Sequence, residues 1–147
     1  GLEVQRVMAE EGVDLEDVVI GHCGDTTDTD YLMRLADKGS LIGMDRFGID
    51  FVMSTQARVD TIAAMAKRGY ADRMVLSHDC CICWSDFFPS MDEYARVMPK
   101  HHLHHIHDDV LPMLREAGVS EADLDAMFVG NPRRLFEGTA ARFVSRS

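Results

Sequence analysis

Met74-Val75-Leu76-Ser77-His78-Asp79 is a short apolar run that ends in a histidine and a carboxylate. Such a run is typical of a buried parallel strand that delivers polar side chains at its carboxyl end. Two earlier runs have the same form, Val18-Val19-Ile20-Gly21-His22 and Leu41-Ile42-Gly43-Met44-Asp45-Arg46. Three strands of this kind predict one shared site at one rim of a parallel sheet. That rim is either the carboxyl face of an α/β barrel or the switch point of an open sheet.

Helical patterns separate and follow the three strands, and this alternation predicts an α/β fold with a parallel sheet. The apolar spacing and the glycine stops predict helices over 2–11, about 30–38, 55–68, 106–117 and 120–127, with a final helical turn over 133–136. Asp28 or Thr29 is the expected N-cap of the second helix. The long segment from Asp79 to about His101 is interpreted as a lid or binding loop.

The loop from Arg46 to Ser54 is unusually rich in apolar side chains. They are Phe47, Ile49, Phe51 and Val52. Beside a candidate site such side chains could line a pocket, or they could be core beneath a long loop. The sequence favours neither reading over the other.

The length of the chain conflicts with a complete barrel. Its 147 residues with 46% hydrophobic content suit one domain with a sizeable core. A full eight-stranded α/β barrel needs roughly 200 residues or more, and only three strand-helix units are recognisable. We therefore expect residues 1–138 to be the carboxyl-terminal part of a larger barrel and residues 139–147 to be a frayed tail. The alternative is a small self-contained α/β domain.

Composition excludes several classes of partner. The net charge of −10 argues against nucleic acid, because phosphate binding needs clustered Lys and Arg. No apolar run approaches membrane-spanning length and no signal-peptide pattern opens the chain, so no membrane partner is expected. The four cysteines do not form the pattern of a secreted disulfide framework, which predicts a reducing cytoplasm.

His22 and Asp79 are the strongest candidates for chemistry. A hydrolytic metal site needs neutral imidazoles and carboxylates that converge on cations and leave a water free to attack. Two ligands do not hold a catalytic metal alone, and each residue could be a satisfied polar group in a strand-to-loop turn. Arg46, at the end of the strand that begins at Leu41, could form an ion pair with Asp25 or Asp79, or orient a substrate oxygen.

Cysteines and histidines cluster later in the chain. The spacing of Cys80-Cys81-Ile82-Cys83 is poor for a closed zinc site, so thiols that line a pocket are the better interpretation. Trp84 could form a pocket wall or cover the fold. In the cluster from His101 to His107, a helix would place His101, His104 and His105 on one face that could chelate a transition metal. A solvated loop and helix start is the favoured alternative.

Together these motifs resemble the carboxyl-terminal part of the phosphotriesterase family, within the amidohydrolase superfamily, and are closer to its phosphotriesterase-like lactonases. The resemblance covers nearly all of the chain up to about Glu137. The matching stretches are residues 20–26, 41–50, 76–79 and 106–119 and the dipeptide Asn131-Pro132. The resemblance implies a (β/α)₈ TIM barrel with a two-metal site at its carboxyl rim, of which this chain would supply strands six to eight.

The resemblance also assigns roles to individual residues. His22 matches the metal histidine after strand six, and Asp79 matches the strand-eight aspartate that binds a metal and takes a proton from the bridging hydroxide. Arg46 falls where lactonase-type members carry an arginine. Asp25 matches an acidic residue that helps to shuttle the proton. The implied catalytic residues are thus Asp79, Arg46 and Asp25, the metal ligands His22 and Asp79, and the substrate contacts Arg46, Cys80, Cys81 and Trp84.

The implied function is metal-dependent opening of lactones, including the acyl-homoserine lactones of quorum sensing, with weaker phosphotriester hydrolysis. It implies two divalent metal ions, with zinc expected and cobalt, iron or manganese as alternatives, and a homodimer of the full-length protein. The strand-one histidines, strand-four lysine and strand-five histidine of the family have no counterpart here, so this chain alone is expected to be inactive. The alternative function is a non-catalytic half-barrel that serves as an assembly or binding module.

Overall fold

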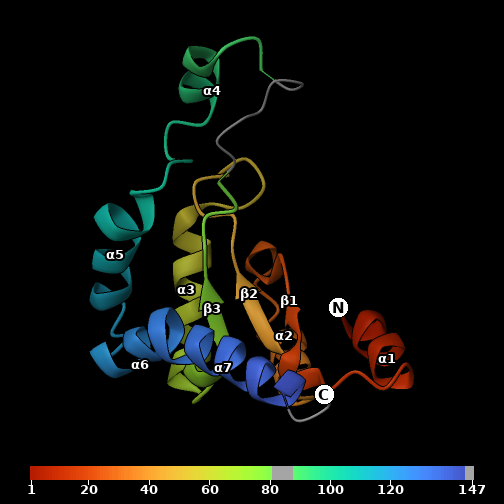
Figure 1. Cartoon of the computed structure of the whole chain (residues 1–147). Coiled ribbons are helices and arrows are strands. Elements are labelled where there is room, and N and C mark those ends of the chain that lie inside the picture. Colours follow the sequence, from red (N-terminus) through yellow and green to blue (C-terminus); the bar gives the residue numbers. More distant parts are fainter. Residues whose placement is uncertain (81–87, 145–147) are drawn as a thin grey trace.

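In a computed structural model that describes residues 1–80 and 88–144, three parallel strands form the centre of the chain (Figure 1). They lie in the order of the sequence and are β1 (Val19–Ile20), β2 (Leu41–Met44) and β3 (Met74–Leu76). Ile42 of β2 pairs with Ile20 of β1 and with Met74 of β3, and all three side chains are buried. The predicted α/β fold with a parallel sheet is therefore confirmed.

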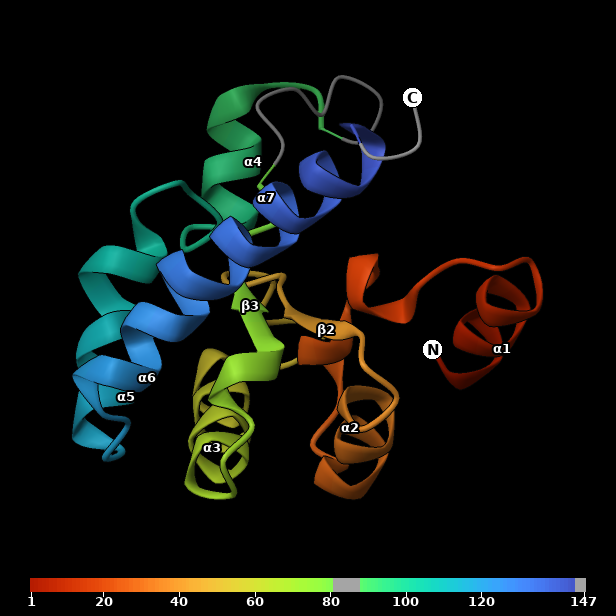
Figure 2. The ribbon, with the colours of Figure 1, turned by 60° about the horizontal axis from the view of Figure 1, so that its bottom comes forward.

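The two connecting helices, α2 (Thr29–Ala36) and α3 (Thr55–Lys67), pack on the same face of the sheet (Figure 2). Each begins at a side-chain cap, a carboxylate or hydroxyl oxygen that accepts a backbone N–H of the first turn. Asp28 accepts from the backbone of Tyr31 over 2.9 Å, which selects it over Thr29, and Ser54 caps α3. The resulting core contains buried leucine, isoleucine and methionine side chains from both helices and all three strands.

The carboxyl-terminal part of the chain is more helical than predicted. Its helices are α5 (Leu111–Glu116), preceded by a π-helical turn over Ile106–Val110, and α6 (Glu121–Asp125), which continues through a π-helical turn over Ala126–Gly130 into α7 (Asn131–Val144). The predicted final turn over 133–136 was therefore too short. The buried Asn131 amide donates to the carbonyl oxygens of Ala71 (2.9 Å) and Met74 (2.7 Å), which fixes α7 against the start of β3. Fraying of the last residues stays a prediction.

The interpretation of the segment from Asp79 to His101 as a loop was wrong in part. It contains α4 (Met91–Val97), which lies beyond the carboxyl ends of the strands (Figure 1). Tyr94 of this short helix and Met98, which follows it, form a second, small core with Ile49. The apolar loop 46–54 thus divides: Phe47 and Ile49 are core, whereas 77% of Phe51 is exposed. The helix was missed because proline flanks it on both sides and it spans barely two turns.

The outer parts of the sheet and the first helix are comparatively open. α1 (Leu2–Glu10) packs near α2, but Val4 and Val7 are exposed, so the apolar side chains of this helix are only partly covered. Within the described residues β1 and β3 each pair with β2 alone, and Val19 of β1 is 39% exposed. Short 3₁₀ helices cover residues Leu15–Asp17, Cys23–Asp25 and Ala71–Arg73. None of the helices described is both long and apolar enough to cross a membrane.

Candidate active site

His22, Arg46 and Asp79 share one backbone geometry. Their φ angles are 59°, 63° and 56°, and they are the only non-glycine residues with positive φ in the part of the chain that the structure describes. Each follows one strand, β1, β2 or β3, within three residues. A left-handed L-residue costs roughly 1–2 kcal/mol, and such strain persists mainly at functional sites. The three predicted rim residues are therefore held by the fold in a costly conformation.

Asp45 holds His22 at two points. The backbone N–H of His22 donates to Asp45 Oδ2 over 2.9 Å, and the ring Nδ1 of His22 lies 3.1 Å from Asp45 Oδ1. Asp45 is buried, whereas half of the His22 side chain is exposed. This arrangement directs the second ring nitrogen, Nε2, away from the carboxylate and leaves it available to a ligand. The sequence interpretation noted Asp45 only as the end of a strand and missed this contact.

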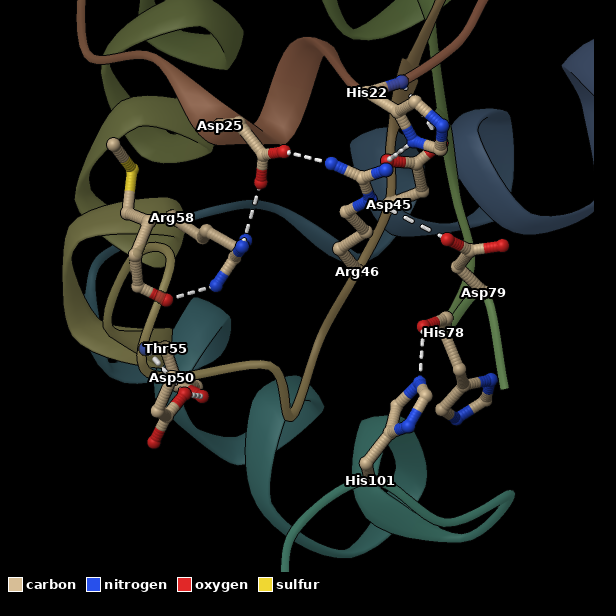
Figure 3. Close-up of polar contacts among 11 residues, drawn as sticks. His22, Asp25, Asp45, Arg46, Asp50, Thr55, Arg58, His78, Asp79 and His101 are labelled. Carbon is tan, nitrogen blue, oxygen red and sulfur yellow. Dashed lines mark hydrogen bonds and ion pairs between the residues drawn. The ribbon is translucent and has the colours of Figure 1, made fainter. Parts of the chain in front are cut away.

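Arg46 joins two carboxylates across the strand ends. Its Nη1 donates to Asp25 Oδ2 over 2.6 Å, and its Nε donates to Asp79 Oδ2 over 3.4 Å (Figure 3). The hydrogen bond from Arg46 to Asp25 raises the pKa of the guanidinium, so Arg46 is cationic. The predicted pairing with Asp25 or Asp79 is thus realised with both partners. It places Asp25, Arg46 and Asp79 in one connected group.

Arg58 of α3 is a fourth member of this group that the sequence interpretation missed. Its Nη2 donates to Asp25 Oδ1 over 2.7 Å, and its Nη1 donates to the carbonyl oxygen of Met53. The Arg58 side chain is completely buried. An arginine four residues after a helix cap looks like a surface residue, but its spacing of one residue from Val59 and four from Ile62 could have placed it on the buried face.

The 3₁₀ turn Cys23–Asp25 carries Asp25 to the rim. Gly24 makes this possible, because an added Cβ would lie 2.7 Å from the carbonyl oxygen of Asp45. The thiol of Cys23 donates to the carbonyl oxygen of Ile20 over 3.2 Å. Burial, with the nearby charge of Asp45, raises the pKa of the Cys23 thiol to about 11. Cys23 is therefore a neutral packing residue and not a thiolate ligand.

The histidine cluster is structural in a way that the sequence did not predict. His101 is buried, with Nδ1 2.8 Å from the Tyr94 hydroxyl and Nε2 3.1 Å from the carbonyl oxygen of His78. His105 is also buried, with Nδ1 2.8 Å from Asp109 Oδ2. The expectation of a solvated segment was wrong for these two residues, because the ring of His101 contacts His78 after β3 and Nε2 of His105 lies 3.3 Å from Oγ1 of Thr55 at the start of α3.

The less favoured alternative, a chelating face of His101, His104 and His105, is not formed either. His101 precedes the helix, which begins only at His105. His104 is exposed, whereas His101 and His105 are buried. Among residues 1–80 and 88–144, no group of three or more His, Cys, Asp or Glu side chains is arranged to hold a metal ion. The chemistry of His22 and Asp79 would suit two ligands of a metal, because Nε2 of His22 and the half-exposed Asp79 carboxylate follow β1 and β3, the strands on either side of β2.

The predicted substrate contacts beyond Arg46 are only partly visible. Cys80 carries a free, half-buried thiol whose Sγ lies 3.6 Å from the carbonyl oxygen of His101 and 3.9 Å from the Tyr94 hydroxyl. It therefore packs between the end of β3 and the segment around α4. Cys81 and Trp84 lie outside the described residues, so their roles stay predictions. Burial lowers the pKa of neighbouring His78, and charges on nearby histidines lower it further.

Comparison with known proteins identifies the family. Residues 1–136 match the sequence profile of the Phosphotriesterase family. The chain belongs to the phosphotriesterase family. Its relatives include a phosphotriesterase homology protein of Mycobacterium tuberculosis, 54% identical over 138 residues, which are 93% of this chain and 41% of that protein. This family member thus spans about two-fifths of the length of the curated relative.

Solved structures of the family superimpose on the same region. The structure of the phosphotriesterase from Mycobacterium tuberculosis matches with a TM-score of 0.88 and 51% identity over 92% of this chain and 41% of that one. A mutant of a PTE-like lactonase from Deinococcus radiodurans matches with a TM-score of 0.81 and 33% identity, over 91% of this chain and 43% of that one. The α/β fold with its parallel sheet is therefore the fold of this part of the family.

Proposed function

We propose that the whole protein to which these residues belong is a metal-dependent hydrolase that opens lactones, acyl-homoserine lactones included. Weaker hydrolysis of phosphotriesters is part of the proposal. The observation that carries it is the set of three strained rim residues, His22, Arg46 and Asp79, in a chain of the phosphotriesterase family. Two matching structures, a phosphotriesterase and a mutant of a PTE-like lactonase, support the two substrate classes.

We further propose that β1, β2 and β3 are strands six to eight of a (β/α)₈ barrel. The outer edges of β1 and β3 each lack a neighbouring strand within the described residues, as expected if further strands complete the sheet. Two neighbouring helices on one face agree with the helical layer outside such a barrel. A homodimer and a cytoplasmic location belong to the same proposal.

The proposed cofactor is a pair of divalent metal ions, with zinc expected. His22 would hold a metal through Nε2 and Asp79 through its carboxylate, and the other ligands would come from outside the described residues. When bound, the ions would polarise the scissile carbonyl or phosphoryl oxygen and lower the pKa of the attacking water. Asp45 fixes the His22 ring for this role, as carboxylates commonly do for metal-bound histidines.

The residues of this chain supply positioning and proton transfer in the proposed reaction. Asp79 accepts the proton of the attacking water on a carboxylate oxygen. Arg46, held cationic by Asp25, orients a substrate oxygen beside Asp79. Guanidinium groups contact both oxygens of Asp25, which supports an orienting role for this residue. For Asp25 to accept a proton as a shuttle, one of these two contacts would first have to open. Cys80, Cys81 and Trp84 are proposed to border the acyl group of the substrate.

The test measures lactone hydrolysis and metal content of the whole protein and of His22→Ala and Asp79→Ala variants. Both variants should lose hydrolysis by a factor on the order of 10³ or more, since each removes a metal ligand. His104→Ala and Asp60→Ala, exposed residues outside the site, are matched controls that should retain activity. Retained activity in either site variant would contradict the proposal. A folded, metal-free oligomer without hydrolysis would instead support the non-catalytic assembly module.

A further inference from the structure

We infer that Arg58 is a positioning residue of the proposed site: it fixes Asp25, which in turn directs Arg46 toward Asp79. This inference rests on the proposed function and names a residue that acts only through others. Arg58 comes from α3, whereas the other three residues lie in the turns after β1, β2 and β3. It would therefore couple the helical layer to the reacting end of the sheet (Figure 3).

The burial of Arg58 is difficult to explain by stability alone. Its side chain has no solvent exposure, and its neighbours on the buried face of α3 include Val59 and Ile62. Removing a guanidinium from water carries a large desolvation penalty, and well-packed apolar side chains in place of buried ion pairs are often neutral or stabilising. An apolar residue would therefore satisfy the packing of α3 at this position. The charge of Arg58 indicates a role that packing does not supply.

Arg58 uses two of its three guanidinium nitrogens for hydrogen bonds and leaves the third without a partner among the described residues. Nη2 donates to Asp25 Oδ1 over 2.7 Å and Nη1 donates to the carbonyl oxygen of Met53. Its Nε is buried and makes no hydrogen bond to any part of the chain that the structure describes. A site optimised for stability would satisfy this donor, because a buried group without a partner is costly. The geometry instead sets one end of the guanidinium against Met53 and aims the other at Asp25.

The carboxylate of Asp25 transmits this orientation to Arg46. Arg58 occupies Oδ1 of Asp25, and Arg46 occupies Oδ2 over 2.6 Å, so the carboxylate cannot rotate without losing a charged contact. Arg46 in turn reaches Asp79 Oδ2 over 3.4 Å, the longest contact of the four-residue chain. Long hydrogen bonds are weak and sensitive to displacement. The Arg46–Asp79 contact is therefore the one that should fail first when Arg58 is removed.

The experiment compares lactone hydrolysis by the whole protein with that of Arg58→Met, a variant of similar length without the charge. We expect kcat to fall about 10- to 100-fold, the range that small misplacements of reacting groups cause, while KM changes by less than about threefold. Arg58→Lys, which keeps the charge but not the two-ended contact, should retain an intermediate kcat. Arg68→Met makes the same substitution at the exposed end of α3 and should leave kcat unchanged.

A double-mutant cycle with Asp25→Asn separates positioning from a general structural effect. If Arg58 acts through Asp25, adding Arg58→Met to Asp25→Asn should lower kcat little further. Effects that multiply, or an Arg58→Met variant with kcat within about twofold of wild type, would overturn the inference. If Arg58→Met does not fold, Arg58→Lys takes its place in the same cycle with the same criteria.

A crystal structure of the Arg58→Lys variant tests the inference independently of activity. Loss of the contact between Arg46 and Asp79 would support positioning, whether or not Arg46 keeps Asp25, and an unchanged contact between Arg46 and Asp79 would overturn it. Absence of lactone hydrolysis in the wild-type protein would contradict the proposed function, and the crystal structure would then decide the inference about Arg58 alone.

Discussion

The Nδ1 atom of His22 lies 3.1 Å from Oδ1 of Asp45, and the backbone N–H of His22 donates to Oδ2 of the same carboxylate over 2.9 Å. One buried side chain on β2's carboxyl end thus fixes both the left-handed backbone and the ring of a residue that follows β1. A histidine held in this way presents its other ring nitrogen to a ligand. Because the ring is already fixed, no further conformational freedom is lost when the ligand binds. The proposed metal site therefore depends on Asp45 as well as on its ligands.

Asp45→Asn should weaken metal binding by the whole protein about 10- to 100-fold, the usual effect of removing the carboxylate partner of a metal-bound histidine. The amide keeps the volume and one acceptor, but its NH₂ group competes with the donor role of His22 Nδ1. Competition with a chelator measures the affinity. Asp37→Asn, at an exposed carboxylate that accepts from the Tyr70 hydroxyl, is the matched control. Equal affinities of the Asp45→Asn variant and wild type would contradict the prediction.

Backbone strain at Arg46 should reverse the usual order of stability between the glycine and alanine variants of a residue. Because Arg46 has a φ of 63°, Arg46→Gly should be more stable than Arg46→Ala by about 1 kcal/mol. Both variants lose the same ionic contacts, so the difference reports the backbone. At Arg34, inside α2, the order should be the usual one, with the alanine variant more stable by about 0.5–1 kcal/mol. Urea unfolding measures both pairs, and an alanine variant as stable as glycine at position 46 would contradict this account.

Gly48 should tolerate no side chain, because the segment after α4 rests on it. An added Cβ would lie 2.6 Å from the carbonyl carbon of Lys100, with the carbonyl oxygen closer still, and the φ is +93°. Gly48→Ala should therefore cost about 2 kcal/mol or more in the free energy of unfolding. Gly69, with a φ of +88° and open space around its Cβ position, isolates the backbone effect, and Gly69→Ala should cost only about 1 kcal/mol. Equal losses at the two glycines would show that contact with Lys100 is unimportant.

Asp50 should give a pH-dependent contribution to stability. Burial alone would raise the pKa of Asp50, but hydrogen bonds from Thr55 and Lys100 outweigh it and lower the pKa below its usual value. A lowered carboxyl pKa contributes stability above the unfolded-state pKa, and this stability is lost as the pH falls through the folded-state pKa. Asp50→Asn should thus be less stable than wild type at about pH 7, and the difference should shrink below about pH 4.

Urea midpoints at several pH values measure this difference for Asp50→Asn. Asp60→Asn, which removes a carboxylate that accepts a hydrogen bond from the neutral amide of Gln56, is the control. A difference between Asp50→Asn and wild type that stays constant down to about pH 3 would show that the contacts of Asp50 do not depend on its charge.

Local sequence patterns predicted those features of the fold that depend on residues close together in the chain. The three strands, the α2 and α3 helices and the rim positions of His22, Arg46 and Asp79 follow from apolar runs, caps and glycine stops that lie within a few residues of each other. The pairing of Arg46 with both candidate carboxylates was also within reach, since all three residues were expected at one rim.

Residues whose role depends on distant partners were missed. The spacing of Arg58 from Val59 and Ile62 could have indicated its burial but not its contact, because its partner Asp25 lies 33 residues earlier. His101 and His105 looked like solvated residues, because the contacts of His101 with His78 and of His105 with Thr55 join residues 23 and 50 positions apart. The helix α4 itself depends on Ile49, which supplies the apolar surface that a helix of seven residues needs.

The sequence by itself thus determined the family, the parallel α/β architecture and the strand ends at which His22, Arg46 and Asp79 lie. Periodicity and turn chemistry act over a few residues and can be read from one stretch at a time. The tertiary structure alone decided which partner each rim residue meets: Asp45 for His22, and Arg58 for Asp25. Charged contacts depend on the separation and burial of atoms from different elements, which are fixed only when β1, β2 and α3 pack together.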